Sequence, residues 1–276
     1  MPNQFLIIGQ GAIGYALANQ LAKQGESVIT MSRTAKSYPC GNVNHLQMDA
    51  RRIDRVVDDV NQVTHIAIIV APDRGASDRL NAYHESYFQI CQAVADIADR
   101  LPSIQQVLFV SSTSVYGENA GEWIDEHSPA KPALPTAQVL YDAEQMIKNA
   151  YGDKSVIVRP SGIYGKSRRR MIELAKKTHV DGVPSTHYTN RIMDVDLVAV
   201  LARIMICDAP KSMYLVTDLL PVSSLDVMMF ICQVLDVAPP VAIDAPPTGK
   251  HILSNVPRDW LTFPDYKAGY AWILED

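Results

Sequence analysis

Runs of apolar residues alternate with amphipathic segments through the first two thirds of the chain. The runs predict strands at 5–8, 27–31, 44–48, 65–70, 106–110 and 155–159. Between them, apolar residues recur at helical spacing at 15–23, 77–100 and about 136–150. The alternation predicts an α/β fold, a Rossmann-type doubly wound parallel sheet that binds ligands at the carboxyl ends of its strands.

The same pattern predicts two parts. Residues 1–165 are expected to form a dinucleotide-binding domain, with elements around 190–220 returning to it, and 166–276 to form mainly a smaller C-terminal substrate-binding lobe. The proline-rich segment 238–247 is expected to be a loop in that lobe. In the first part, the segment 77–100 is expected to be one long helix whose inward face carries Leu80, Tyr83, Tyr87, Ile90, Val94 and Ile97.

Three glycines follow the first strand directly, in the pattern Gly-x-Gly-x-x-Gly, and a helix is predicted after them. A strand, a tight turn and a helix N-terminus in that order suit the pyrophosphate of a dinucleotide. We expect Gly9 to permit the turn, Gly11 to leave room for the pyrophosphate, and Gly14 to let the helix pack closely on the strand. Ala12 and Ile13 would add backbone contacts. The alternative is a purely structural strand–helix turn.

The end of the second strand bears on the type of cofactor. NAD sites usually place an acid there for the ribose 2′-hydroxyl, and this chain has Ser32 and Arg33 instead. Ser32 could hydrogen-bond a 2′-phosphate, and Arg33 could pair with it through charge-assisted hydrogen bonds or stack on adenine. The pattern therefore favours NADP over NAD, the alternative being an exposed loop arginine.

Composition excludes several other classes of protein. The net charge of −5 lacks the basic footprint of a general nucleic-acid binder. No apolar run approaches the roughly 20 residues that cross a bilayer, and no signal peptide precedes the first strand, so we expect a cytoplasmic protein. The four cysteines are scattered and the seven histidines show no ligand spacing, so no metal site is expected.

Three segments together resemble the extended short-chain dehydrogenase/reductase superfamily, in its NAD-dependent epimerase/dehydratase branch. They are the glycine turn, the segment 109–117 with its Ser-Ser-x-x-Val-Tyr-Gly pattern, and the segment 158–165 with Arg-Pro-x-x-Ile-Tyr-Gly. The later segment 194–197 is also similar to the family. Near the C-terminus, Ser254-Asn255, Trp260 and 263–269 resemble a small atypical bacterial subgroup.

The resemblance implies further contacts with the cofactor. Asp49, after the third strand, would accept a hydrogen bond from the adenine amine. Val70, Ala71 and Pro72 would line the cofactor behind the fourth strand. Ser111, Ser112 and Pro160 would face the nicotinamide end.

The resemblance also implies a catalytic Ser/Thr, Tyr and Lys, and here the chain departs from the family. Ser112 lies in the Ser/Thr position, with a hydroxyl that caps the strand end as the alternative. One alignment of the helix 136–150 puts Thr136 and Leu140 in the Tyr and Lys positions, and a shifted one puts Tyr141 and Gln145 there. Neither supplies a lysine, so an ordinary tyrosine would keep its reference pKa near ~10 and be a poor base at neutral pH. Tyr141 is the better candidate by chemistry and Thr136 by alignment.

The substrate side also departs from the family pattern. Thr189 and Met193 stand where nucleotide-sugar epimerases often have Arg and His, although Arg191 lies nearby. The basic residues 168–170 could bind a phosphate or form a solvated helix start. The sequence thus predicts an NAD(P)-dependent oxidoreductase similar to epimerases and dehydratases, acting on a sugar nucleotide or a small hydroxylated or carbonyl substrate. The alternative is a non-catalytic NADP-binding sensor or regulatory protein.

Overall fold

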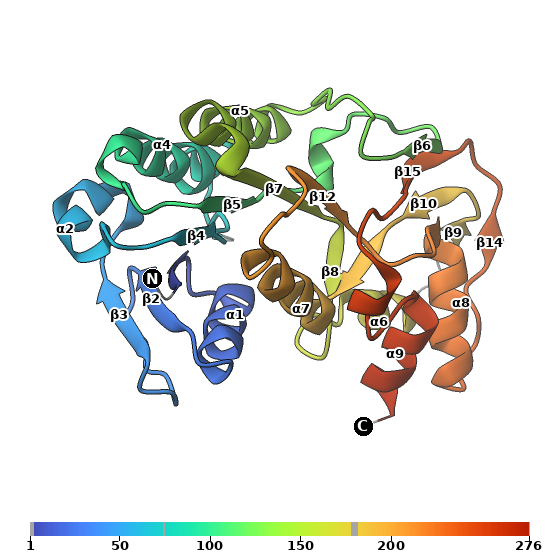
Figure 1. Cartoon of the computed structure of the whole chain (residues 1–276). Helices are drawn as coiled ribbons and strands as arrows, with labels where there is room; N and C mark the ends of the chain where they lie inside the picture. Colours follow the sequence, from blue (N-terminus) through green and yellow to red (C-terminus); the bar gives the residue numbers. More distant parts are fainter. Residues whose placement is uncertain (1–2, 74, 178–181, 276) are drawn as a thin grey trace. The chain divides into compact units, whose positions relative to one another are not determined.

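The chain folds into two units, each with its own sheets. The computed structural model describes residues 3–73, 75–177 and 182–275 (Figure 1). Unit 1 comprises residues 1–115, 132–159 and 201–214, and unit 2 comprises 116–131, 160–200 and 215–276. Compared with the boundary expected at 165, this division gives 116–131 and 160–165 to unit 2.

Unit 1 is built on a seven-stranded sheet with the order β12-β7-β5-β4-β1-β2-β3. Neighbouring strands from β7 to β3 pair in parallel, which confirms the predicted doubly wound α/β fold. The strand order reverses between β1 and β4, and ligands of such sheets bind at this reversal. The strands are β1 (Gln4–Ile8), β2 (Ser27–Ser32), β3 (Val43–Gln47), β4 (His65–Ile68), β5 (Gln106–Val110), β7 (Ser155–Pro160) and β12 (Met213–Val216).

Helices cover both faces of this sheet, with α1 on one face and α4 and α5 on the other (Figure 1). A buried ion pair fixes α5: Arg159 of β7 donates from Nε to Glu144 at 2.9 Å and from Nη2 at 2.5 Å. The helices are α1 (Ala12–Lys23), α2 (Val57–Val60), α3 (Arg79–Tyr83), α4 (Gln89–Asp96) and α5 (Pro135–Tyr151), while α7 (Asp194–Met205) runs from unit 2 into unit 1. Short 3-10 helices occupy Ala50–Val56, Ala98–Arg100, Thr113–Val115 and Gly152–Lys154.

The long helix expected over 77–100 is present from 79 to 96, but it is not regular. The segment forms α3, a π-helical turn at His84–Phe88, and then α4. A π turn inserts one extra residue, which rotates everything before it by roughly 100° about the helix axis. Val94 and Ile97 are buried as expected, whereas Leu80, on the other side of the π turn, is 45% exposed.

Unit 2 contains a four-stranded mixed sheet, with the order β13-β10-β15-β6, and two short two-stranded sheets, β11-β8 and β14-β9. Its apolar core joins α6, α8 and α9. The expected loop 238–247 contains the short strand β14. The elements are β6 (Glu122–Ile124), β8 (Gly162–Tyr164), α6 (Arg170–Ala175), β9 (Val183–Pro184), β10 (His187–Thr189), β11 (Arg191–Met193), β13 (Val222–Ser223), α8 (Ser224–Val234), β14 (Ala242–Ile243), β15 (Thr248–Ile252), a 3-10 helix (Arg258–Trp260) and α9 (Tyr266–Leu274).

The C-terminal segments singled out in the sequence have structural contacts within unit 2. Asn255 accepts a hydrogen bond from the backbone N–H of Leu215 at 2.8 Å, and the Ser254 hydroxyl donates to the Leu215 carbonyl at 3.2 Å. Together they hold the end of β12. In α9, a Cβ on Gly269 would lie 1.9 Å from the Tyr164 hydroxyl, so this position requires glycine.

Candidate functional site

The glycine turn after β1 divides into two structural glycines and one open position. Gly9 has φ +93°, and a Cβ there would lie 2.1 Å from the Ile69 carbonyl oxygen. A Cβ on Gly14 would lie 2.0 Å from the carbonyl oxygen of Gly9. Around Gly11, by contrast, an added Cβ meets no described atom within 4 Å. At Gly9 and Gly14, other backbone atoms thus lie too close to admit a side chain, whereas Gly11 faces open space.

Gly11 is also the N-cap of α1. No side chain in the described part of the chain caps this end, and the first turn carries no acid. The first backbone N–H groups of a helix have no partner within the helix and attract anions. Ala12 is exposed and Ile13 is buried, so these two residues can offer backbone N–H groups while the Ile13 side chain packs in the core.

Ser32 and Arg33 lie where β2 ends. The Ser32 hydroxyl donates to the Thr34 carbonyl at 2.8 Å, and Arg33 is exposed. Arg33 contributes to the lowered pKa of Asp49, so its positive charge acts on the neighbouring strand end.

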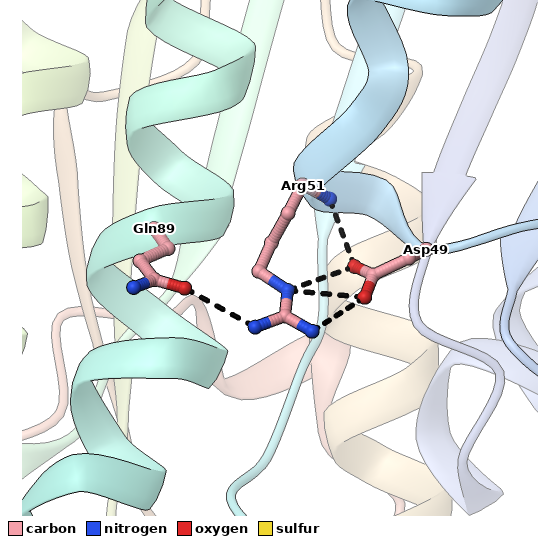
Figure 2. A network of polar contacts seen from close by, with 3 residues as sticks. All are labelled: Asp49, Arg51 and Gln89. Carbon is pink, nitrogen blue, oxygen red and sulfur yellow. Dashed lines mark hydrogen bonds and ion pairs between the residues drawn. The ribbon is translucent and has the colours of Figure 1, made fainter.

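Asp49 follows β3 and caps the next 3-10 helix by accepting from the backbone of Arg51 at 3.0 Å (Figure 2). The Arg51 guanidinium also binds the Asp49 carboxylate, from Nε at 3.1 and 3.0 Å and from Nη2 at 2.6 Å, and its Nη1 donates to Gln89 on α4 at 3.2 Å. These hydrogen bonds hold the pKa of Asp49 below its usual value. The carboxylate is therefore ionised and fixed in direction.

The sequence did not single out Arg51 or Gln89. The only local signal for Arg51 was an arginine two residues after a strand-end acid, and Gln89 comes from an element 38 residues away. Arg51 donates to both oxygens of the Asp49 carboxylate, which is the group expected to accept from adenine. Arg51 therefore belongs to this part of the candidate site.

The residues after β4 and β5 lie at the same carboxyl edge of the sheet as the glycine turn, because the strands are parallel. Val70 and Pro72 are half-buried, Ala71 is exposed, and the Ile69 N–H donates to the Ile8 carbonyl at 2.8 Å. This bond keeps the segment beside the end of β1.

Ser111 and Ser112 follow β5. Ser111 is 6% exposed, and its hydroxyl has no hydrogen-bond partner among the described residues. The half-buried Ser112 accepts from the backbone N–H of Ser114 at 3.1 Å, a bond that leaves its own proton free to be donated. The Ser112 hydroxyl thus accepts a backbone hydrogen bond after the strand and can still donate to a substrate.

Helix α5 carries the two candidate acid/base residues and packs against the 3-10 helix that follows Ser112. Thr136 and Tyr141 are half-buried, whereas Leu140, which stands in one candidate lysine position, is 1% exposed. An apolar side chain thus fills that position. Pro160, at the end of β7, groups with unit 2.

Residues 5–200 match the family model described as the NAD dependent epimerase/dehydratase family. A solved structure from Methylobacillus flagellatus, classed with the NAD-dependent epimerases/dehydratases, is 28% identical, with coverage of 100% of this chain and 98% of that chain and a TM-score of 0.79. MoeE5 in complex with UDP-glucose and NAD is 20% identical (99% and 98% covered, TM-score 0.72). A UDP-glucuronic acid 4-epimerase variant from Bacillus cereus, in complex with a UDP-sugar analogue and NAD, is 14% identical (99% and 99% covered, TM-score 0.74). No curated protein sequence matches the chain significantly.

No helix in the described part of the chain is long and apolar enough to span a membrane. Within the same residues, no group of three or more His, Cys, Asp or Glu side chains is arranged to hold a metal ion.

Proposed function

The chain belongs to the NAD dependent epimerase/dehydratase family, and from this premise we propose that it is an oxidoreductase that binds a nicotinamide dinucleotide and acts on a nucleotide sugar or another small hydroxylated or carbonyl compound. The observation that carries the proposal is the open position at Gly11 on the uncapped N-terminus of α1. A pyrophosphate needs both features together: space beside the backbone and N–H groups directed at the anion.

The other residues fit the rest of the same cofactor. The Asp49 carboxylate, oriented by Arg51, would accept from the adenine amine. Val70, Ala71 and Pro72 would line the cofactor after β4. At the nicotinamide end, Ser111 offers a buried hydroxyl that needs a partner, and Ser112 and Pro160 complete this set. The cofactor would supply hydride transfer, and the chain's residues would bind and orient it.

At the adenosine ribose we propose a preference for NADP over NAD. Its basis is local: the exposed Arg33 follows β2, Ser32 ends that strand, and neither is an acid. A 2′-phosphate would accept charge-assisted hydrogen bonds from Arg33. The two ligand-bound relatives described above hold NAD, so this preference would distinguish the present chain from them.

The acid/base chemistry is the point where the chain would depart from its family. No tyrosine in the sequence is followed four residues later by a lysine. We propose that Ser112 orients the substrate and that the proton moves through Tyr141, or through Thr136 with the help of a neighbouring base or a water relay. The buried Leu140 favours the second candidate function, a non-catalytic NADP-binding sensor, because that position then offers no cation to lower a tyrosine pKa.

Two measurements test these proposals. Calorimetric titration should show tighter binding of NADPH than of NADH, and Arg33→Asp should weaken NADPH binding by on the order of 1–3 kcal/mol. Lys36→Asp, an equal charge change in the same exposed loop, is the control. Equal affinities for the two cofactors would refute the NADP preference.

Hydride exchange between bound NADPH and a panel of nucleotide sugars and small carbonyl compounds separates the two functions. Turnover that is lost in Ser112→Ala supports the enzyme, and comparison of Tyr141→Phe with Thr136→Val identifies the proton donor. Tight cofactor binding without turnover of any panel member supports the sensor.

A further inference from the structure

A second group of polar residues lies within unit 2. Tyr164 on β8, Arg191 on β11 and Asp218 just after β12 are 4%, 4% and 1% exposed. Each contributes one buried atom that has no hydrogen-bond partner in the described part of the chain: Tyr164 Oη, Arg191 Nη1 and Asp218 Oδ2. We call these three residues the Arg191 cluster.

Backbone contacts bring the members of the Arg191 cluster together. The N–H of Asp218 donates to the carbonyl of Arg191 at 2.6 Å. Strand β11 pairs in parallel with β8, so that Met193, two residues after Arg191, is opposite Tyr164. The electrostatic effects agree with this proximity, because the charge of Arg191 lowers the pKa of both Asp218 and Tyr164, although burial raises both overall.

Asp196, which lies nearby in the sequence, and other polar atoms of Arg191 and Asp218 have hydrogen-bond partners. Asp196 accepts from the backbone N–H groups of Thr262 and Phe263 at 2.9 and 2.8 Å. Arg191 Nη2 donates to the Thr189 hydroxyl, and Asp218 Oδ1 accepts from the Leu220 N–H at 3.3 Å. Three buried atoms of the cluster therefore still lack a hydrogen-bond partner among the described residues: one guanidinium nitrogen, one carboxyl oxygen and one phenolic hydroxyl.

The chemistry of these atoms restricts what can satisfy them. A guanidinium only donates, whereas a carboxyl group accepts and, when protonated, also donates, so a partner common to both has to accept from Arg191 and bond to Asp218 in either protonation state. Water meets this requirement, whereas a cation accepts no hydrogen bond and would be repelled by Arg191. Buried charged groups without partners destabilise a fold strongly, and internal water typically makes about three hydrogen bonds to such groups.

We propose that the Arg191 cluster binds one internal water molecule, which accepts from Arg191 Nη1 and hydrogen-bonds to Asp218 Oδ2 and to Tyr164 Oη. The water links β8, β11 and the segment after β12 within unit 2. The absence of a side chain at Gly269 lets α9 pack directly on the Tyr164 hydroxyl, which keeps that end of the cluster closed.

The variant Tyr164→Phe tests this proposal through the sign of its effect. If the hydroxyl bonds to water, its removal leaves the water with one partner fewer and lowers the melting temperature by a few degrees. If the hydroxyl has no partner, its removal relieves a buried unsatisfied group and leaves the melting temperature unchanged or higher. The second result would overturn the proposal.

Tyr270→Phe is the matched control. Its ring stacks on Tyr164 with centroids 4.6 Å apart, and its hydroxyl is not among the buried unpartnered atoms of the described residues. The melting temperature should fall less in Tyr270→Phe than in Tyr164→Phe, and equal losses would count against the water.

A high-resolution crystal structure of the full chain provides a second, independent measurement. It should show one water within hydrogen-bond distance, about 2.7–3.2 Å, of all three atoms. A direct contact between the Arg191 and Asp218 side chains, or a site without water, would overturn the proposal even if Tyr164→Phe were destabilising.

Discussion

At the scale of single residues, the three glycines of the β1–α1 turn differ in their surroundings, which are crowded at Gly9 and Gly14 and open at Gly11. Gly11→Val should abolish cofactor binding and leave the fold intact, because its side chain would enter open space where the pyrophosphate is expected. Circular dichroism and thermal melting would report on the fold, and calorimetry on binding. Gly14→Val is the matched control, and it should lower the melting temperature because its Cβ would overlap the Gly9 carbonyl. Normal cofactor binding by Gly11→Val would make the turn purely structural.

A second prediction at this scale concerns Arg51. Arg51→Met releases the Asp49 carboxylate from its three side-chain hydrogen bonds and should weaken dinucleotide binding by about 1 kcal/mol. Arg55→Met removes the same charge from the same 3-10 helix without a hydrogen bond to Asp49 recorded in the described structure, so its affinity should change less. Equal losses in the two variants would mean that only net charge matters there.

At the scale of elements, the sequence predicted the parts that follow from local patterns. Five strands, β1, β2, β4, β5 and β7, were predictable because each is a short, mainly apolar run, and α1 because its turn and spacing are both local. The π turn at His84–Phe88 was not predictable in this way, since one inserted residue leaves the apolar spacing on either side regular. The hydrogen bond between Arg51 and Gln89 was also missed, because it depends on how α4 packs beside the end of β3.

The attachment of α5 to the sheet can be tested by changing its buried ion pair. Glu144→Gln leaves the Arg159 charge without its counter-ion in a site where Glu144 is 0% exposed. Removal of one partner of a buried pair should lower the free energy of unfolding by about 3 kcal/mol in urea denaturation. Asp142→Asn, an exposed acid on the same helix, should change it by less than about 0.5 kcal/mol. If both variants unfold alike, the pair does not stabilise α5.

At the scale of the whole molecule, the dependence of stability on pH combines groups whose effects have opposite signs. Burial lowers the pKa of His65 to about 4, so this side chain favours the folded state at neutral pH and destabilises it as the pH falls from 6.5 towards 4. Burial raises the pKa of Asp218 to about 7, so its contribution is largest at low pH and is lost as the pH rises through 7. The two slopes partly cancel in the wild-type protein.

His65→Phe isolates the first of these effects. The phenyl ring can keep the stacking on Phe5, at a centroid distance of 4.9 Å in the native pair, and it binds no proton. The free energy of unfolding of the wild type relative to the variant should therefore decrease by about 3 kcal/mol between pH 7 and pH 4, because burial lowers the pKa of this side chain from 6.5 to about 4. Urea denaturation at intervals of half a pH unit would measure this difference, in which the contribution of Asp218 cancels because it is common to both proteins. If the difference in unfolding free energy between the two proteins stays constant across this pH range, His65 has the same pKa in the folded and unfolded chains. Its burial would then not disfavour the protonated imidazole.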